Sequence, residues 1–145
     1  MSLLHRAALG LTAGTLAVGV GVAVAPAATP KTYKATLKGA NVVPKQGDRD
    51  GSGTATVRIT GTRLCYTLTL SRVASTVGGH IHRGVAGKAG PVAQAFYMGT
   101  EDRSDCVTVK SLLASQIAAN PGRFYVQLHN SKFPDGAVRG QLRKG

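Results

Sequence analysis

The sequence predicts an all-β domain, an antiparallel β-sandwich or Greek-key barrel of about seven to eight short strands with one short helix. Three observations support this prediction. Apolar and polar residues alternate in several short runs, which is the pattern of strands with one buried face. The runs recur at intervals of roughly ten residues and are separated by segments rich in glycine, proline, asparagine and aspartate. One segment alone has the spacing of a helix.

The first part of the domain is predicted to contain three strands, at residues 32–38, 54–60 and 63–71. In the first of them Tyr33, Ala35 and Leu37 lie on one face, which we expect to be buried. Gly61 and Thr62 supply a tight connection between the second and the third strand. These two strands are therefore expected to form a β-hairpin.

The second part is predicted to contain the helix and the remaining strands. Residues 111–119 form the helical candidate, which Ser111 is expected to cap and in which Leu113 and Ile117 lie one turn apart. The strands are expected at residues 79–82, 92–98, 106–109, 123–129 and 137–142. The strand at 123–129 alternates most clearly, so one set of its residues should face the core and the other should face outward. The inward set is Phe124, Val126 and Leu128, and the outward set is Tyr125, Gln127 and His129.

Residues 1–28 are predicted to be a signal peptide, which leaves residues 29–145 as one β domain. A short basic start precedes an uncharged, mostly apolar run at residues 7–24, and Ala25-Pro26-Ala27 is a small-residue cleavage site. The apolar run also approaches the length of a bilayer span, so an uncleaved membrane anchor is the alternative. With cleavage, no membrane span remains. The protein is then expected to be secreted, either extracellular or in the cell envelope.

The chain is strongly basic, with 18 lysines and arginines against 6 aspartates and glutamates and a net charge of +12. Such a charge suits an anionic partner, for which an anionic cell-envelope polymer or an extracellular protein is the candidate. The sequence favours an ordinary solvated surface over this interpretation, because the cations are scattered along the chain. Nucleic acid is not expected, since the chain has few aromatic residues and no tryptophan to stack on bases. The oligomeric state is left open.

The two cysteines, Cys65 and Cys106, are predicted to form a disulfide. An exported chain meets an oxidising environment, and both side chains fall on the face of their strands opposite the predicted core residues. Two free thiols are the alternative. Metal binding by the pair has little support, because no C-x-x-C spacing accompanies it.

A glycine-rich stretch at residues 78–92 contains His80 and His82, which point to the same face of a strand because they are two residues apart. His129 lies on the outward face of its own strand. If the two strands are neighbours, three imidazoles converge, and neutral imidazoles suit a copper or zinc ion. The sequence favours a structural interpretation over this one, with the histidines bonded to loop carbonyls that fix the glycine-rich segment.

The remaining polar residues do not form a recognisable catalytic set. There is no G-x-S-x-G motif. Most of the 6 acidic residues are paired in predicted loops, so few carboxylates remain for a hydrolysis that needs two of them. No catalytic residues are therefore predicted, and the sequence favours a role other than an enzyme. Arg83 and Arg139 have two interpretations, recognition of an anion or bracing of loop carbonyls.

Several segments together resemble the chordin-type (CHRD) domain family, from about residue 32 to residue 142. The residues that carry the resemblance are Leu37-Lys38-Gly39-Ala40, Val43-Pro44, residues 53–57, residues 79–84, Gly87, Gly90-Pro91-Val92, residues 125–129 and residues 134–142. Two departures concern acidic side chains, because Val43 and Ala137 stand where the family usually has glutamate. The resemblance implies a secreted all-β module with no established activity. We accordingly expect a non-enzymatic extracellular or cell-envelope binding or structural module.

A second, fainter resemblance is to the copper-zinc superoxide dismutases, which hold copper on an H-x-H strand and on a later strand that ends in histidine, near an arginine. The matching positions here are His80, His82, His129 and Arg139. The zinc-binding portion has no counterpart, because no histidine lies between Arg83 and Leu128. This resemblance implies the alternative function, a mononuclear copper or zinc protein with a redox role.

Overall fold

The computed structural model describes residues 27–96 and 104–145. The predicted signal segment up to residue 26 lies outside the described residues, as do the last two residues of the strand predicted at 92–98. The strands are β1 (Lys31–Lys38), β2 (Ser52–Thr60), β3 (Arg63–Ser71), β4 (Thr76–Arg83), β5 (Val92–Phe96), β6 (Ser104–Thr108), β7 (Phe124–Asn130), β8 (Val138–Gln141) and β9 (Arg143–Lys144). The helices are α1 (Ser111–Ala119) and two short 3-10 turns, η1 (Gly39–Asn41) and η2 (Pro121–Arg123).

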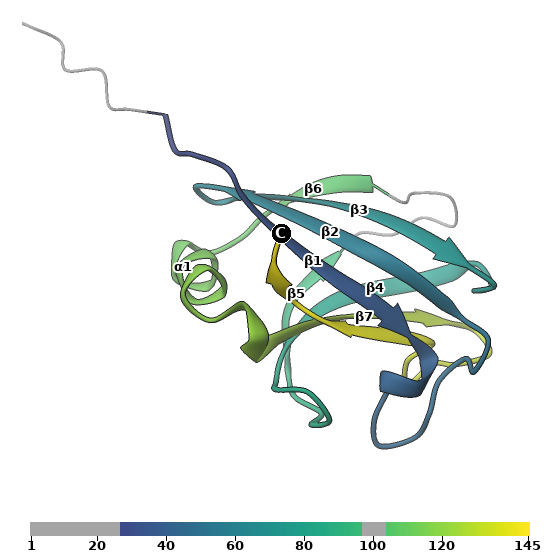
Figure 1. Ribbon diagram of the computed structural model, residues 1–145. Helices are drawn as coiled ribbons and strands as arrows, with labels where there is room; N and C mark the ends of the chain where they lie inside the picture. The colour runs from purple at the N-terminus through teal and green to yellow at the C-terminus, as the bar shows by residue number, and fades with distance from the viewer. Residues whose placement is uncertain (1–26, 97–103) are drawn as a thin grey trace, which may run out of the picture.

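The strands form one nearly closed antiparallel sheet, which confirms the predicted fold class. The strand order is β5-β4-β7-β8-β1-β2-β3-β6, and β9 pairs with β1 beside this path. The sheet curls on itself, so that β1, β2 and β3 lie across the core from β4 and β7 (Figure 1). The hairpin predicted from the short glycine connection is β2 and β3, which pair over their whole length from Ser52 opposite Ser71 to Thr60 opposite Arg63.

The core is built from the alternating residues that the sequence marks as apolar. The buried members from β1, β2 and β3 are Tyr33, Ala35, Leu37, Ala55, Val57, Ile59, Leu64, Tyr66 and Leu68. Ile81 of β4 and Val126 and Leu128 of β7 belong to the same core cluster. The ring of Tyr66 stacks on that of Phe96 from β5, with the ring centroids 4.3 Å apart. Strands from both halves of the chain therefore share one core.

Helix α1 covers part of this core and has the bounds that the sequence predicts. Leu113 and Ile117 are buried, as their spacing requires. The predicted cap is wrong, because Ser111 is already the first helical residue and Lys110 occupies the N-cap without a side-chain bond. Among the residues described, no helix is long and apolar enough to cross a membrane.

Strand β7 differs from the prediction on its outer face. Tyr125 is only 2% exposed and Gln127 only 5%, although the alternation placed both in solvent. Two loops cover them. The amide of Gly90 donates a hydrogen bond to the Tyr125 hydroxyl, and the Gln127 side chain donates one to the carbonyl of Asp135. On the outer face of β7, Tyr125 and Gln127 are therefore buried beneath the loops, although both side chains carry polar groups.

The disulfide between Cys65 and Cys106 is confirmed. The two residues lie directly opposite each other in β3 and β6, and their Cα atoms are 3.9 Å apart. Because β6 pairs only with β3 within the described sheet, the bridge fastens the last strand of the sheet order to its single neighbour.

Candidate functional site

Neighbouring strands β4 and β7 bring the three predicted histidines together. Their antiparallel register sets His82 opposite Tyr125, His80 opposite Gln127 and Gly78 opposite His129. Paired residues point to the same face of a sheet, so all of these side chains lie on the outer face of β4 and β7. Gly78 itself has no side chain, and a Cβ added there would meet no atom within 4 Å.

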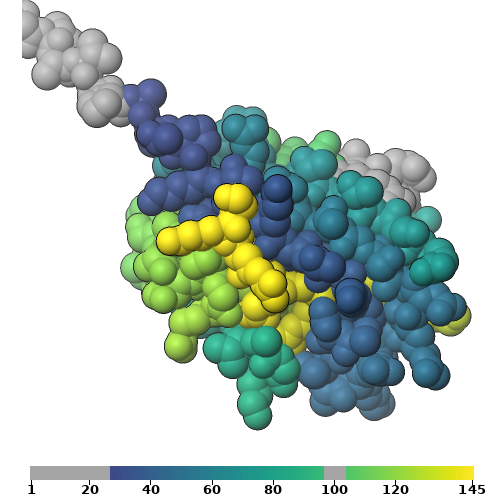
Figure 2. All heavy atoms as spheres, in the orientation of Figure 1, coloured from purple at the N-terminus to yellow at the C-terminus, as the bar shows by residue number. Residues whose placement is uncertain are grey.

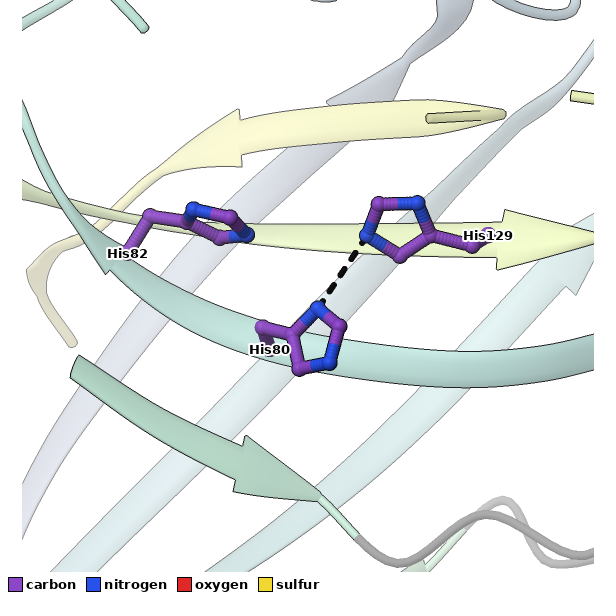
Figure 3. Close-up of side chains that lie close together, drawn as sticks. All are labelled: His80, His82 and His129. Atoms are coloured by element: carbon purple, nitrogen blue, oxygen red, sulfur yellow. Dashed lines mark hydrogen bonds between the residues drawn. The ribbon is translucent and has the colours of Figure 1, made fainter. Parts of the chain in front are cut away.

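The three imidazoles converge on one point. His80, His82 and His129 each offer a ring nitrogen, and these three nitrogens all lie within 4.8 Å of one another. The closest approach is the 3.2 Å hydrogen bond between His80 Nδ1 and His129 Nε2. In Figure 3 the rings of His82 and His129 reach toward each other from opposite ends, and His80 closes the third side.

Backbone carbonyls fix the tautomers of two of the rings. His82 Nδ1 donates to the carbonyl of Gly90 at 2.9 Å, and His129 Nδ1 donates to the carbonyl of Pro134 at 2.8 Å. A carbonyl only accepts, so these Nδ1 atoms carry protons and each Nε2 has a lone pair, which in His129 accepts the hydrogen bond from His80 Nδ1.

His82 Nε2 is a buried nitrogen that has no hydrogen-bond partner among the residues described. The His82 side chain is 9% exposed, so bulk water does not replace the missing partner. Buried polar atoms are nearly always satisfied, and an exception calls for an explanation. The lone pair of this atom belongs to the set of three nitrogens that converge, so a bound metal ion would satisfy it.

The surroundings favour the neutral forms of His80 and His82. Burial lowers the pKa of His80 below its ordinary value, and the nearby His129 and His82 lower it further. Burial also lowers the pKa of His82, helped by His129 and Arg139, while its hydrogen bond to Gly90 acts in the opposite direction. Neutral imidazole is the form that binds metal ions.

Tyr125 separates the histidines from Arg139. The His82 ring stacks on one side of the tyrosine ring with the centroids 4.8 Å apart and the planes 6° from parallel. The guanidinium carbon of Arg139 lies 3.4 Å from the centroid of the same ring. Arg139 Nη2 donates to the carbonyls of Val85 and Lys88 at 3.0 and 2.8 Å. These contacts are of the bracing type, one of the two interpretations that the sequence offered.

Arg83 lies apart from this arrangement. Its Nη2 donates to the side-chain oxygen of Gln116 in α1, and its guanidinium carbon lies 4.9 Å from the centroid of the Phe124 ring. Of the predicted site residues, the structure thus brings together the three histidines, sets Arg139 behind Tyr125, and directs Arg83 toward the helix.

Sequence reasoning missed the residues that hold the histidines in place, namely Tyr125, Gly90 and Pro134. The signal for Tyr125 was present, because it shares the outward face of its strand with His129. Gly90 and Pro134 act through backbone carbonyls, whose positions cannot be predicted from the pattern of side chains in the sequence.

The fold and the site together define a small all-β domain with a histidine cluster on two neighbouring strands. A family model of the CHRD domain matches residues 33–142 of the chain. The chain therefore belongs to the CHRD domain family, which suggests a binding or structural module. The family and the disulfide are compatible with secretion. No curated protein and no solved structure matches the chain.

Proposed function

We propose that the protein is an exported binding module that holds one transition-metal ion, copper or zinc, on His80 Nδ1, His82 Nε2 and His129 Nε2. The observation that supports this proposal is the unpartnered, buried Nε2 of His82, which lies within 4.8 Å of the ligand atoms of the other two histidines. Nitrogens that share one ion at about 2 Å can be at most about 4 Å apart. Ring movements on the order of 1 Å would therefore complete the site.

The donor set favours particular metals. Three neutral imidazoles without a carboxylate or thiolate suit copper and zinc, and at equal availability copper binds such ligands more tightly. Binding replaces the hydrogen bond between His80 and His129, because His80 Nδ1 must give up its proton to become a ligand. With three protein ligands, the ion keeps at least one position for water or another small ligand.

Metal analysis of tag-free protein tests this proposal. After loading with Cu²⁺ or Zn²⁺ and desalting, we expect about one ion per chain. His80→Ala and His82→Gln should each lower this stoichiometry, whereas Lys132→Ala, an exposed change near His129, should not. A stoichiometry near zero for the wild type with both metals, or one that His80→Ala leaves unchanged, would contradict the proposal.

We further propose that the module has no enzymatic activity of its own and is retained on an anionic polymer of the cell envelope. Residues 1–28 contain one of the 18 cations, Arg6, so the exported chain keeps 17 against 6 acidic residues, and this net charge of +11 supports retention. Export depends on the signal peptide predicted in residues 1–28, which would release residues 29–145, and the N-terminal sequence of the exported protein tests this step. Binding to purified cell-wall material should weaken as salt is added, because salt screens the exposed charges. If the affinity for wall material does not change with salt concentration, this result would argue against retention by charge.

A further inference from the structure

Two adjoining hollows lie along the outer side of β1. The first, of about 520 Å³, lies between the end of β1, the turn η1, the glycine-rich loop and strands β8 and β9. The second, of about 390 Å³, lies between β1, β2 and β9 and shares Thr36 and Arg143 with the first. This face carries β1 and the C-terminal residues side by side, in blue and yellow (Figure 2).

The two hollows are lined by five cations, which we call the β1 basic track. Its members are Lys34, Lys38, Arg139, Arg143 and Lys144. Among the described residues that line either hollow, none is an aspartate or a glutamate. The track therefore presents positive charge with no carboxylate in the lining to offset it.

The register of the strands places like charges next to each other within the track. Lys38 of β1 lies opposite Arg139 of β8, and Lys34 of β1 lies opposite Arg143 of β9. Like charges directly opposite each other in a sheet are destabilising. An anion bound between them would remove this repulsion, which makes the pairing a feature that favours a ligand.

Arg139 gives the track a fixed donor. Its side chain is 2% exposed, and its Nη1 is buried without a hydrogen-bond partner among the described residues. Its Nη2 is bonded to the loop carbonyls, and Tyr125 packs against its guanidinium, so its orientation is set before any ligand arrives. Because both hydrogens of Nη2 are engaged by the loop carbonyls, the unpartnered Nη1 is the group left to donate to a carboxylate or phosphate oxygen.

The lining favours a polysaccharide over a nucleic acid. Thr36, Thr54 and Thr56 lie beside the cations, and hydroxyl groups both donate hydrogen bonds to sugars and accept them. No aromatic residue lines either hollow within the described chain, whereas proteins that bind single-stranded nucleic acid stack bases on aromatic rings. The two hollows also extend the cations over several residues of one strand, which suits a repeating anion.

We infer that the β1 basic track binds a linear polysaccharide that carries repeated oxyanion groups, either carboxylate or phosphate. This inference depends on the proposed retention on an envelope polymer, for which it names the binding surface. The track shares no residue with the proposed metal ligands, because no histidine lines either hollow.

The test compares two triple variants of the exported protein that remove the same charge. The track variant is Lys34→Gln, Lys38→Gln and Arg143→Gln, which leaves the braced Arg139 intact. The control variant is Arg49→Gln, Arg63→Gln and Lys110→Gln, at exposed positions that line neither hollow. Binding is measured at low and moderate salt to polygalacturonate, a phosphate-bearing mannan, neutral dextran, single-stranded DNA and purified wall material.

We expect the wild type to bind one or both acidic polysaccharides in a salt-dependent way and to ignore dextran. The track variant should bind about tenfold more weakly at low salt, and the control variant should stay within about threefold of the wild type. The acidic polysaccharide that the wild type binds more tightly shows whether carboxylate or phosphate is recognised. The track variant should also melt at a higher temperature than the wild type, because it removes the Lys34–Arg143 repulsion, and this shows that it folds.

Three results would overturn the inference while leaving retention by charge intact. They are equal losses in the two variants, wall binding without binding to either acidic polysaccharide, and tighter binding to DNA than to both. Failure of the wild type to bind wall material or any anionic polymer would overturn the retention proposal itself.

Discussion

At the scale of single residues, Gly90 links the loop to the histidine site through its backbone. Its carbonyl accepts the hydrogen bond from His82, and its amide donates to the hydroxyl of Tyr125. A Cβ added at this position would lie 1.8 Å from the carbonyl oxygen of Arg83. That oxygen belongs to the backbone at the end of β4, so the clash cannot be relieved by turning a side chain.

We therefore expect Gly90→Ala to displace the loop, destabilise the fold by about 1–3 kcal/mol and weaken metal binding. Urea denaturation and metal titration measure the two effects. Gly122→Ala is the matched control, because a Cβ there meets no atom within 4 Å, and it should change stability by no more than about 0.5 kcal/mol. Equal effects from the two substitutions would show that Gly90 has no special role.

The lowered pKa values of His80 and His82 make the stability of the metal-free protein depend on pH. Their pKa is lower in the folded than in the unfolded state, so below about pH 6.5 the unfolded chain binds more protons. The free energy of unfolding should therefore fall as the pH drops from 7.5 to 5. Urea denaturation in the presence of a chelator measures it. His80→Gln with His82→Gln should flatten this pH dependence, and an unchanged slope would exclude the histidines as its source.

At the scale of secondary-structure elements, the disulfide fastens β6 to the sheet. β6 pairs only with β3 within the described sheet, and Cys65 and Cys106 are 41 positions apart in the sequence. Replacing both cysteines with alanine should cost about 4 kcal/mol, because a crosslink over a loop of this length restricts the unfolded chain. The free energy of unfolding from urea denaturation, compared with that of the oxidised wild type, measures the loss. A loss below about 1 kcal/mol would mean that strand pairing alone holds β6 in place.

The strands also show which parts of the fold could be predicted from the sequence. Alternation in β1, β2 and β3 predicted their inward residues, because each of these strands buries one face. It failed for Tyr125 and Gln127, because two loops cover the outer face of β7, and alternation contains no information about loops that return from elsewhere in the chain. The separation of His80 and His82 predicted a shared face. That His129 lies beside them follows from the pairing of β4 with β7, a contact across 49 positions that local patterns do not specify.

At the scale of the whole molecule, the candidate metal site joins segments that are distant in the sequence. β4 and β7 bring His80 and His129 together, while the loop carbonyls of Gly90 and Pro134 fix the rings. A ligand that binds only the folded state stabilises it by an amount that grows with ligand concentration, about 2.7 kcal/mol at one hundred times the dissociation constant.

Thermal unfolding should therefore move to higher temperature when Cu²⁺ or Zn²⁺ is added to the chelator-treated protein. His129→Asn should abolish the shift, since it removes one of the three ligands. A shift of the same size in this variant would place the bound metal elsewhere on the protein.

The stack of His82, Tyr125 and Arg139 has an optical consequence. The chain contains no tryptophan and 4 tyrosines, so tyrosine emission is not masked by a brighter fluorophore. One face of Tyr125 touches a candidate copper ligand, and the other touches the arginine of the β1 basic track. Copper on His82 should quench the emission of Tyr125. A polysaccharide oxyanion on Arg139 should also change this emission, but in metal-free protein, where copper quenching plays no part. A single ring would then serve as a built-in probe of two ligands that never meet, and Tyr125→Phe should lower both signals.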